Sequence, residues 1–162
     1  MSATDIAAWI GAVTGTLVLI WDVYKWMQTG PKVKVSVAPN MVAYGSAVTI
    51  LGSKANIMVE VTNTGDGKTT ITHLVGFFYR SRLRKWLRRK PDRTMVVPNP
   101  GSGQLPHVIH PGERWIGAMD QSADLIKMSN EGALYVGVLH STQKRPVLAR
   151  VIIRETDVEK NP

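Results

Sequence analysis

The chain of 162 residues contains no cysteine. Disulfide bonds, thiolate zinc sites and a cysteine nucleophile are therefore excluded together, whereas the compartment stays open. Acidic residues are also few, 12 against 20 lysines and arginines, and the formal net charge is +8. The apolar content of 44% still suffices for a core of ordinary size, so the composition is not that of a disordered chain.

Strongly apolar stretches of helical length are scarce, and the clearest covers Ile6 to Trp21. Its sixteen uncharged residues would rise roughly 24 Å as a helix, short of the ~30 Å hydrocarbon thickness of a bilayer. Counting on to Tyr24 closes most of that gap. We therefore expect residues 1–29 to form a single membrane anchor.

Two other interpretations compete with a spanning anchor. A cleaved signal peptide is disfavoured because no basic residue precedes the apolar run, and Thr29, Gly30 and Pro31 after it make a poor cleavage site. A buried or interfacial helix of a soluble fold is the other alternative, since its shorter length would suffice there.

The flanks of the run predict how the anchor would sit. Aromatic and basic residues suited to the membrane interface are Trp9, Trp21, Tyr24, Lys25 and Trp26. Only Asp5 precedes the run, whereas Lys25, Lys32 and Lys34 accompany its end. The positive-inside rule then predicts a single-pass protein of the inner membrane with an external N-terminus and a cytoplasmic C-terminal domain.

Small residues recur on the predicted helix at a spacing of four. Ala7, Gly11 and Gly15 share one face, which would let another helix approach closely. This pattern predicts packing with a second copy or with a membrane-protein partner. Small residues are common in apolar segments, so composition alone remains an equal explanation.

After Pro31 the pattern becomes that of β-strands. Lys32 to Val37 and Ile57 to Val61 alternate apolar and polar residues, and Thr69 to Tyr79 is rich in β-branched and aromatic residues. Turn residues at 63–67 separate the last two stretches, so we expect them to form a hairpin. A weaker strand is expected at 47–51.

Further strands are expected at 95–97, 114–119, 134–140 and 147–154, with a second hairpin around 141–146. Between 120 and 131 a short helix is predicted, with Asp120 or Ser122 as N-cap and Gly132 as C-cap. The chain thus divides into an anchor at 1–29, a domain at 30–155 and a polar tail at 156–162.

About seven short strands without long helices between them indicate an antiparallel β-sandwich. The segment VEVTNTGDGKTTITHLVGF resembles the consecutive strands of bacterial immunoglobulin-like modules. Residues 131–135, with Tyr135 entering a late strand, are similar to the tyrosine corner of such domains. The resemblance implies an immunoglobulin-like fold over roughly 32–154. It implies no function, because this fold serves many.

Candidate catalytic and cofactor-binding residues are sparse. His107 and His110 lie beside prolines, and His73 and His140 alternate with apolar strand positions, which favours partly buried, hydrogen-bonded histidines over metal ligands. The Gly-Lys-Thr at 67–69 lacks the earlier glycine of a P-loop. We expect no enzyme activity, cofactor or small-molecule substrate; a site assembled around His73 or His140 is the remaining alternative.

The most distinctive segment is a basic insertion at 80–93, which holds eight cations and one acid. Leu83, Trp86 and Leu87 follow Tyr79 at helical spacing, which predicts a short amphipathic helix. The predicted basic patch consists of Arg80, Arg82, Arg84, Lys85, Trp86, Arg88, Arg89, Lys90 and Arg93.

Three interpretations of the basic patch stay open. It could contact anionic lipid or an acidic protein. It could bind nucleic acid through arginine and a stacking tryptophan, although the sequence shows no known nucleic-acid module. It could also be a solvated loop whose apolar residues cover the edge of the sandwich. The first is favoured, and it predicts a membrane-anchored, non-enzymatic interaction module.

Overall fold

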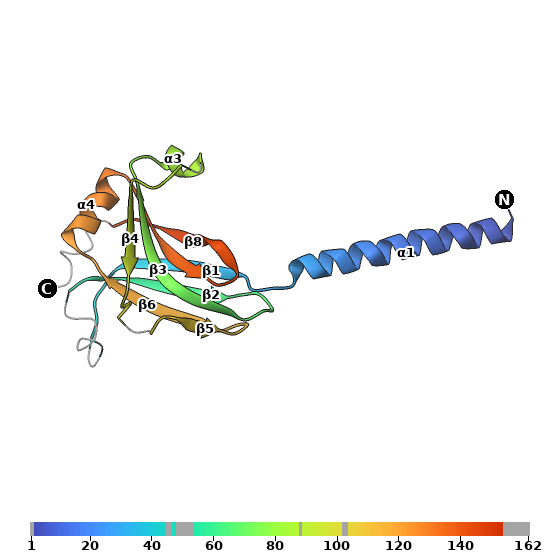
Figure 1. The fold of residues 1–162 in the computed structure, drawn as a ribbon, viewed down its shortest axis with the longest axis horizontal. Helices are drawn as coiled ribbons and strands as arrows, with labels where there is room; N and C mark the ends of the chain where they lie inside the picture. Colours follow the sequence, from blue (N-terminus) through green and yellow to red (C-terminus); the bar gives the residue numbers. More distant parts are fainter. Residues whose placement is uncertain (1, 45–46, 48–53, 88, 102–103, 154–162) are drawn as a thin grey trace.

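The computed structural model describes residues 2–44, 47, 54–87, 89–101 and 104–153 (Figure 1). Most of the strand expected at 47–51, the cation Arg88 and the tail at 156–162 lie outside these residues. The described chain consists of an apolar N-terminal helix and a domain of two antiparallel sheets. A mainly β fold behind an N-terminal helix is thereby confirmed.

Helix α1 runs from Ala3 to Gln28. Ser2 and Asp5 form a capping box at its start, since each side chain bonds the backbone N–H of the other. At about 1.5 Å per residue the helix is roughly 39 Å long, which is longer than the uncharged run alone allowed. Figure 1 shows α1 projecting from one end of the domain without packing on it.

The smaller sheet has the order β1-β2-β6, and all neighbours are antiparallel. Its strands are β1 (Val33–Met41), β2 (Asn56–Asn63) and β6 (Arg114–Asp120). The alternation predicted for the first two strands is present, with Val33, Val35 and Val37 packed against the core.

The larger sheet has the order β4-β3-β7-β8, and β5 pairs with the start of β3. Its strands are β3 (Thr69–Tyr79), β4 (Arg93–Val97), β5 (His107–Ile109), β7 (Ala133–His140) and β8 (Gln143–Val151). β8 begins four residues earlier than expected and contains Pro146. A proline is tolerated there because β8 is an edge strand.

One predicted pairing is wrong. β2 and β3 were expected to form a hairpin, but β2 pairs with β1 and β6, whereas β3 pairs with β4, β5 and β7. Residues 63–67 therefore connect the two sheets. Asparagine and glycine specify a tight change of direction but not which sheet the next strand joins.

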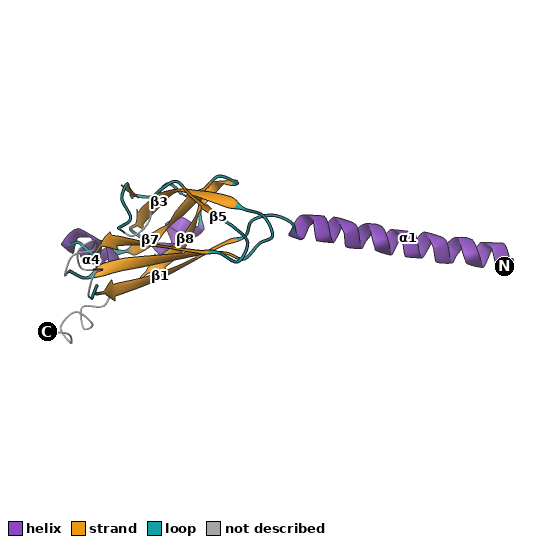
Figure 2. Ribbon diagram, turned by 90° about the horizontal axis from the view of Figure 1, so that it is seen from below, coloured by secondary structure: helices purple, strands orange, loops and turns teal. Residues whose placement is uncertain are grey.

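The two sheets enclose one hydrophobic core (Figure 2). Fully buried residues of β2, β3 and β7 dominate it, including Val59, Leu74 and Val136. Trp115 of β6 joins the same cluster, and its ring lies over Gly117, where a Cβ would come within 2.3 Å of it.

Two short helices lie outside the sheets, one at the end of the domain away from α1 and one above the upper end of β3 (Figure 1). Helix α4 (Ala123–Glu131) confirms the short helix predicted before β7, and it buries Leu125 and Met128. Helix α3 (Arg82–Trp86) lies within the basic insertion, directly after β3. Figure 1 shows α3 above the upper end of β3, set back from the point where α1 leaves.

Candidate functional site

Helix α1 is solvent-exposed over its whole apolar surface. The window that is long and apolar enough to cross a membrane, Ala3–Met27, is 0% buried. Exposed large apolar residues occur on all sides of it, whereas a helix lying in the interface keeps one polar face. In this structure α1 is therefore not a buried helix of the domain.

The polar side chains inside the apolar run bond to the helix itself. Thr14 Oγ1 donates to the carbonyl of Ile10 at 2.8 Å, and Thr16 Oγ1 donates to Ala12 at 2.8 Å. Hydrocarbon offers no hydrogen-bond acceptor, and these internal bonds already satisfy both hydroxyl donors. Ala7, Gly11 and Gly15 lie on one exposed face, and the space beside both glycines is open.

The residues predicted for the membrane interface are all exposed. Trp9 lies near the start of α1, and the rings of Trp21 and Tyr24 are 6.1 Å apart near its end. Lys25 lies in the last turn, and Trp26 follows it at 78% exposure. Four of these residues thus lie together at the domain side of the helix, and Trp9 lies near its other end.

The exit from α1 is bonded to the domain almost at once. Thr29 caps the helix, since its N–H and hydroxyl both reach the carbonyls of Lys25 and Trp26. One residue later the carbonyl of Gly30 accepts from the N–H of Asp66 at 3.1 Å. Thr64 then donates to the carbonyl of Lys32 through its N–H at 2.8 Å and its hydroxyl at 3.1 Å.

Asn63 joins three segments at this exit and is fully buried. Its Oδ1 accepts from the N–H groups of Lys32 and Gly65, and its Nδ2 donates to the carbonyls of Gly67 and Ile109. Both polar atoms of the side chain are thus used twice, which satisfies the hydrogen-bonding capacity of an amide.

Gly65 faces the same exit at very short range. A Cβ at this position would lie 2.1 Å from the Gly30 carbonyl oxygen and 2.4 Å from the Lys32 nitrogen. Only glycine permits the turn at 63–67 to approach the backbone that follows α1 so closely. We call residues 29–32 together with this turn the joint.

The basic insertion is closed at its base by Asp92, and we call residues 80–92 the arm. Asp92 accepts from the N–H of Arg80 at 2.9 Å and pairs with the guanidinium of Arg84. Its own N–H donates to the carbonyl of Phe78 at 2.9 Å. The bond from Arg80, followed by the nearby arginine charges, lowers the pKa of the Asp92 carboxyl group, so it is ionised at neutral pH.

Lys85 holds the arm against the outer face of the larger sheet. Its Nζ lies 3.5 Å from the centre of the Tyr135 ring, which in turn meets Tyr79 edge to face at 5.9 Å. Burial lowers the pKa of Lys85 and raises that of Tyr79. Tyr135, expected at a tyrosine corner, thus belongs to a small outer cluster with Tyr79 and Ala133.

The remaining apolar residues of the arm face solvent. Leu83, Trp86 and Leu87 are 66%, 79% and 55% exposed. The predicted short helix is present as α3, whereas Tyr79, which continues the helical spacing in the sequence, is the buried last residue of β3. The apolar side chains therefore do not cover the edge of the sheets, and the cations Arg82, Arg89 and Lys90 are exposed beside them.

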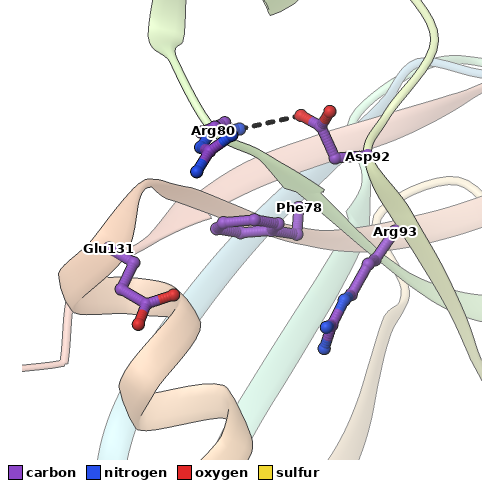
Figure 3. A pocket seen from close by; sticks show the side chains of 5 residues that line it. All are labelled: Phe78, Arg80, Asp92, Arg93 and Glu131. Carbon is purple, nitrogen blue, oxygen red and sulfur yellow. Dashed lines mark hydrogen bonds between the residues drawn. The ribbon is translucent and has the colours of Figure 1, made fainter.

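A groove of about 570 Å³ lies beside the base of the arm, between the ends of β3 and α4. Its lining consists of Phe78, Arg80, Asp92, Arg93 and Glu131 (Figure 3). Figure 3 shows the Phe78 ring between Glu131 and Arg93. The lining combines two carboxyl groups, two guanidinium groups and an aromatic ring, so the groove offers ion pairing beside an aromatic surface.

Of the two histidines predicted on strands, one is buried and the other is exposed. His140 is buried, and its Nδ1 lies 2.7 Å from the Thr142 hydroxyl and 3.3 Å from that of Thr69. This confirms a hydrogen-bonded strand histidine, whereas His73 is exposed. Burial lowers the pKa of His140. Among the described residues, no three metal-ligating side chains lie together.

The structure divides the predicted basic patch into three groups. Arg84 and Lys85 make contacts within the domain, Arg80 and Arg93 line the groove, and Arg82, Arg89 and Lys90 remain exposed with Trp86. Sequence reasoning missed the residues that hold the arm and the joint. The lone acid in the basic insertion, Asp92, was the available signal for the first; nothing local distinguished Asn63 for the second.

Comparison with known proteins gives no family. No protein-family model matches the amino-acid sequence, and no curated protein matches it. One solved structure, of a Bordetella pertussis protein assigned the name ApaA, is 14% identical in sequence with a TM-score of 0.37. That match covers 76% of this chain and 90% of the other. A TM-score this low carries no argument about fold or function.

Proposed function

We propose that this chain is a single-span membrane protein whose cytoplasmic domain is a non-enzymatic interaction module, and that the arm binds an acidic protein partner. The observation that carries the proposal is the arm itself. Leu83, Trp86 and Leu87 are exposed beside several cations, and Asp92 and Tyr135 hold the backbone beneath them in place. Exposed aromatic and apolar side chains on an ordered segment are typical of binding surfaces.

The membrane anchor is supported by α1. Its length of roughly 39 Å exceeds the ~30 Å of hydrocarbon, and its two internal hydroxyls are bonded within the helix. Lys25, Lys32 and Lys34 favour a cytoplasmic domain with an external N-terminus. Ala7, Gly11 and Gly15 would let α1 pack with a second copy or with a membrane partner.

An immunoglobulin-like sandwich is the fold that the strand order supports best. Sheets β1-β2-β6 and β4-β3-β7-β8 enclose one core, and the connection from β2 to β3 crosses between them. In immunoglobulin-like domains the second and third strands likewise belong to opposite sheets. This assignment concerns architecture only, because the fold does not specify a partner.

The acidic partner follows from charge complementarity. Arg82, Arg89 and Lys90 are exposed on the arm, and Arg80 and Arg93 line the neighbouring groove. Because Arg84 neutralises Asp92, the only acid of the insertion does not offset these cations. A partner with carboxylates around an apolar contact would therefore match both features of the arm.

Site-specific photo-crosslinking tests the proposal in the native membrane. A photoreactive residue in place of Trp86 should capture a discrete acidic protein, and high salt or the triple change of Arg82, Arg89 and Lys90 to glutamine should reduce the capture. Val96 is also exposed and apolar but lies on β4, so a photoreactive residue there is the matched control.

Identical products from positions 86 and 96 would contradict an arm-specific contact. Capture of nucleic acid alone, removed by nuclease, would favour the nucleic-acid alternative instead. Capture of lipid alone would assign the arm to the membrane surface and exclude the protein partner.

A further inference from the structure

The joint leaves no free residue between the membrane helix and the domain. Thr29 belongs to the helix as its cap, and the next residue, Gly30, is already bonded to Asp66. Pro31 lacks an N–H but packs beside Gly67, where a Cβ would lie 3.0 Å from its Cδ. Lys32 is bonded to Asn63 and Thr64, and β1 begins at Val33. A flexible linker, which needs several unbonded residues, is absent between α1 and the described domain.

The contacts at the joint resist bending as well as separation. Asn63 is buried and uses its side chain on both the α1 exit and the turn, so moving one segment would leave polar groups unpaired. The turn is also bonded to the loop between β5 and β6, because the N–H of Gly112 donates to the carbonyl of Asn63 at 2.8 Å. Breaking such buried bonds is costly because no water replaces them.

The arm lies at the other end of β3 from this joint. β3 begins at Thr69, just after the turn, and ends at Tyr79, just before the arm. Its eleven residues cover roughly 36 Å along the strand at about 3.3 Å each. In Figure 1 β3 is inclined to α1, and α3 lies above its far end. If the arm stood only half of that length above the bilayer, the separation would still be about two Debye lengths at physiological ionic strength.

We propose that the domain is a rigid stand-off, which holds the arm away from the bilayer from which α1 emerges. This inference rests on the proposed function, because it requires α1 to span the membrane. Attraction between the arm and the lipid headgroups is then screened by salt. The arm is instead available to proteins that reach the same height above the bilayer. The partner is accordingly an acidic surface of a protein that reaches this height above the bilayer, and not the membrane surface.

The absence of cysteine permits a direct test. A single fluorophore is attached to a cysteine in place of Trp86 in the full-length protein, reconstituted in vesicles of phosphatidylcholine with phosphatidylglycerol and nitroxide-headgroup lipid. We expect no more quenching than in vesicles without phosphatidylglycerol. Six glycine and serine residues inserted between Thr29 and Gly30 would span about 13 Å and free the domain to roll. Quenching should then appear and disappear again at high salt.

Gly65→Ala is the second variant, because its methyl group would displace the Gly30 carbonyl without lengthening the chain. It should increase quenching less than the insertion does. A matched control is the same six-residue insertion placed between Pro98 and Asn99, in the exposed loop after β4, which should leave the label unquenched. Circular dichroism of each variant verifies that the sheets are formed.

Two results would overturn the stand-off. One is strong, salt-sensitive quenching of the label with the native joint; the other is an insertion at the joint that changes nothing. Neither result removes the anchor, since membrane insertion is measured separately by alkaline extraction of the same vesicles. The acidic partner is likewise tested separately, by the crosslinking at position 86. Failure of extraction resistance would instead remove the proposed function itself.

Discussion

His140 shows how burial turns a strand residue into a source of pH dependence. Its ring is enclosed near the hydroxyls of Thr69 and Thr142, and burial lowers its pKa below the ordinary value of 6.5. The unfolded chain therefore takes up a proton near pH 6.5 that the folded chain resists. Stability is fully present above that pH and declines as the pH falls toward the lowered pKa of the folded state.

We therefore expect the thermal midpoint of the domain to fall between about pH 7.5 and about pH 5.5, above the range in which carboxylates titrate. His140→Gln should remove most of this decline. The measurement is near-ultraviolet circular dichroism of the full-length protein in detergent at both pH values. His110→Gln is the control, because His110 is exposed; equal pH dependence in both variants would contradict the assignment.

At the scale of elements, the arm is a short segment kept in place by few contacts. Helix α3 has five residues, too few to be stable alone, and none of them is buried. Its position depends on Asp92 at the base and on Lys85 over the Tyr135 ring. Loss of either contact should release the arm while the core stays folded.

Asp92→Ala should accordingly increase the rate of tryptic cleavage within the arm severalfold, because the Arg80 and Arg84 contacts are both lost. Arginines and lysines are abundant there, so cleavage reports opening directly. Asp66→Ala is the matched control, since the exposed Asp66 contributes its backbone N–H to the joint. Equal cleavage rates in the two variants would show that Asp92 does not hold the arm.

Local patterns predicted most elements but not their partners. Alternation identified β1, and the cap residues identified α4, because each depends on nearby sequence. The connection from β2 to β3 was misassigned because a turn of asparagine and glycine suits both a hairpin and a crossing between sheets. The strand ending at Tyr79 and the short helix after it were also predicted, because the change from β-branched residues to helical spacing is local in the sequence.

For the molecule as a whole, the proposed orientation rests on the order of charges around the exposed helix. The positive-inside rule predicts that the start of α1 faces the exterior and that the basic domain lies in the cytoplasm. A single cysteine at Thr4 should react with an impermeant reagent in intact cells. A cysteine at the exposed Thr94 should react only after the membrane is permeabilised.

The reverse pattern of labelling would mean an inverted topology. A mature protein that has lost the label site at position 4 would instead identify a cleaved signal sequence, which has similar length and composition. Glutamine at Lys25, Lys32 and Lys34 is the matching variant, because it removes the charge bias and should produce a mixed orientation.

The sequence predicts which segments contribute to the site but not how their residues come together. The basic insertion and the apolar helix were evident, since both are contiguous in sequence. The joint was not, because Asn63 and Gly65 act on residues about thirty positions earlier. The groove brings Glu131 of α4 beside Phe78 of β3, and such proximity depends on the tertiary fold.

The five tryptophans are divided among the parts of the molecule: Trp9, Trp21 and Trp26 on α1, Trp86 on the arm and Trp115 in the core. Trp115 alone is shielded from solvent, at 3% exposure, with its ring over Gly117. The emission colour of an unlabelled chain is thus a composite of separate environments. Replacing four of the five tryptophans with phenylalanine would leave one native fluorophore. Depending on which tryptophan is kept, its emission would report bilayer insertion, partner contact or core unfolding.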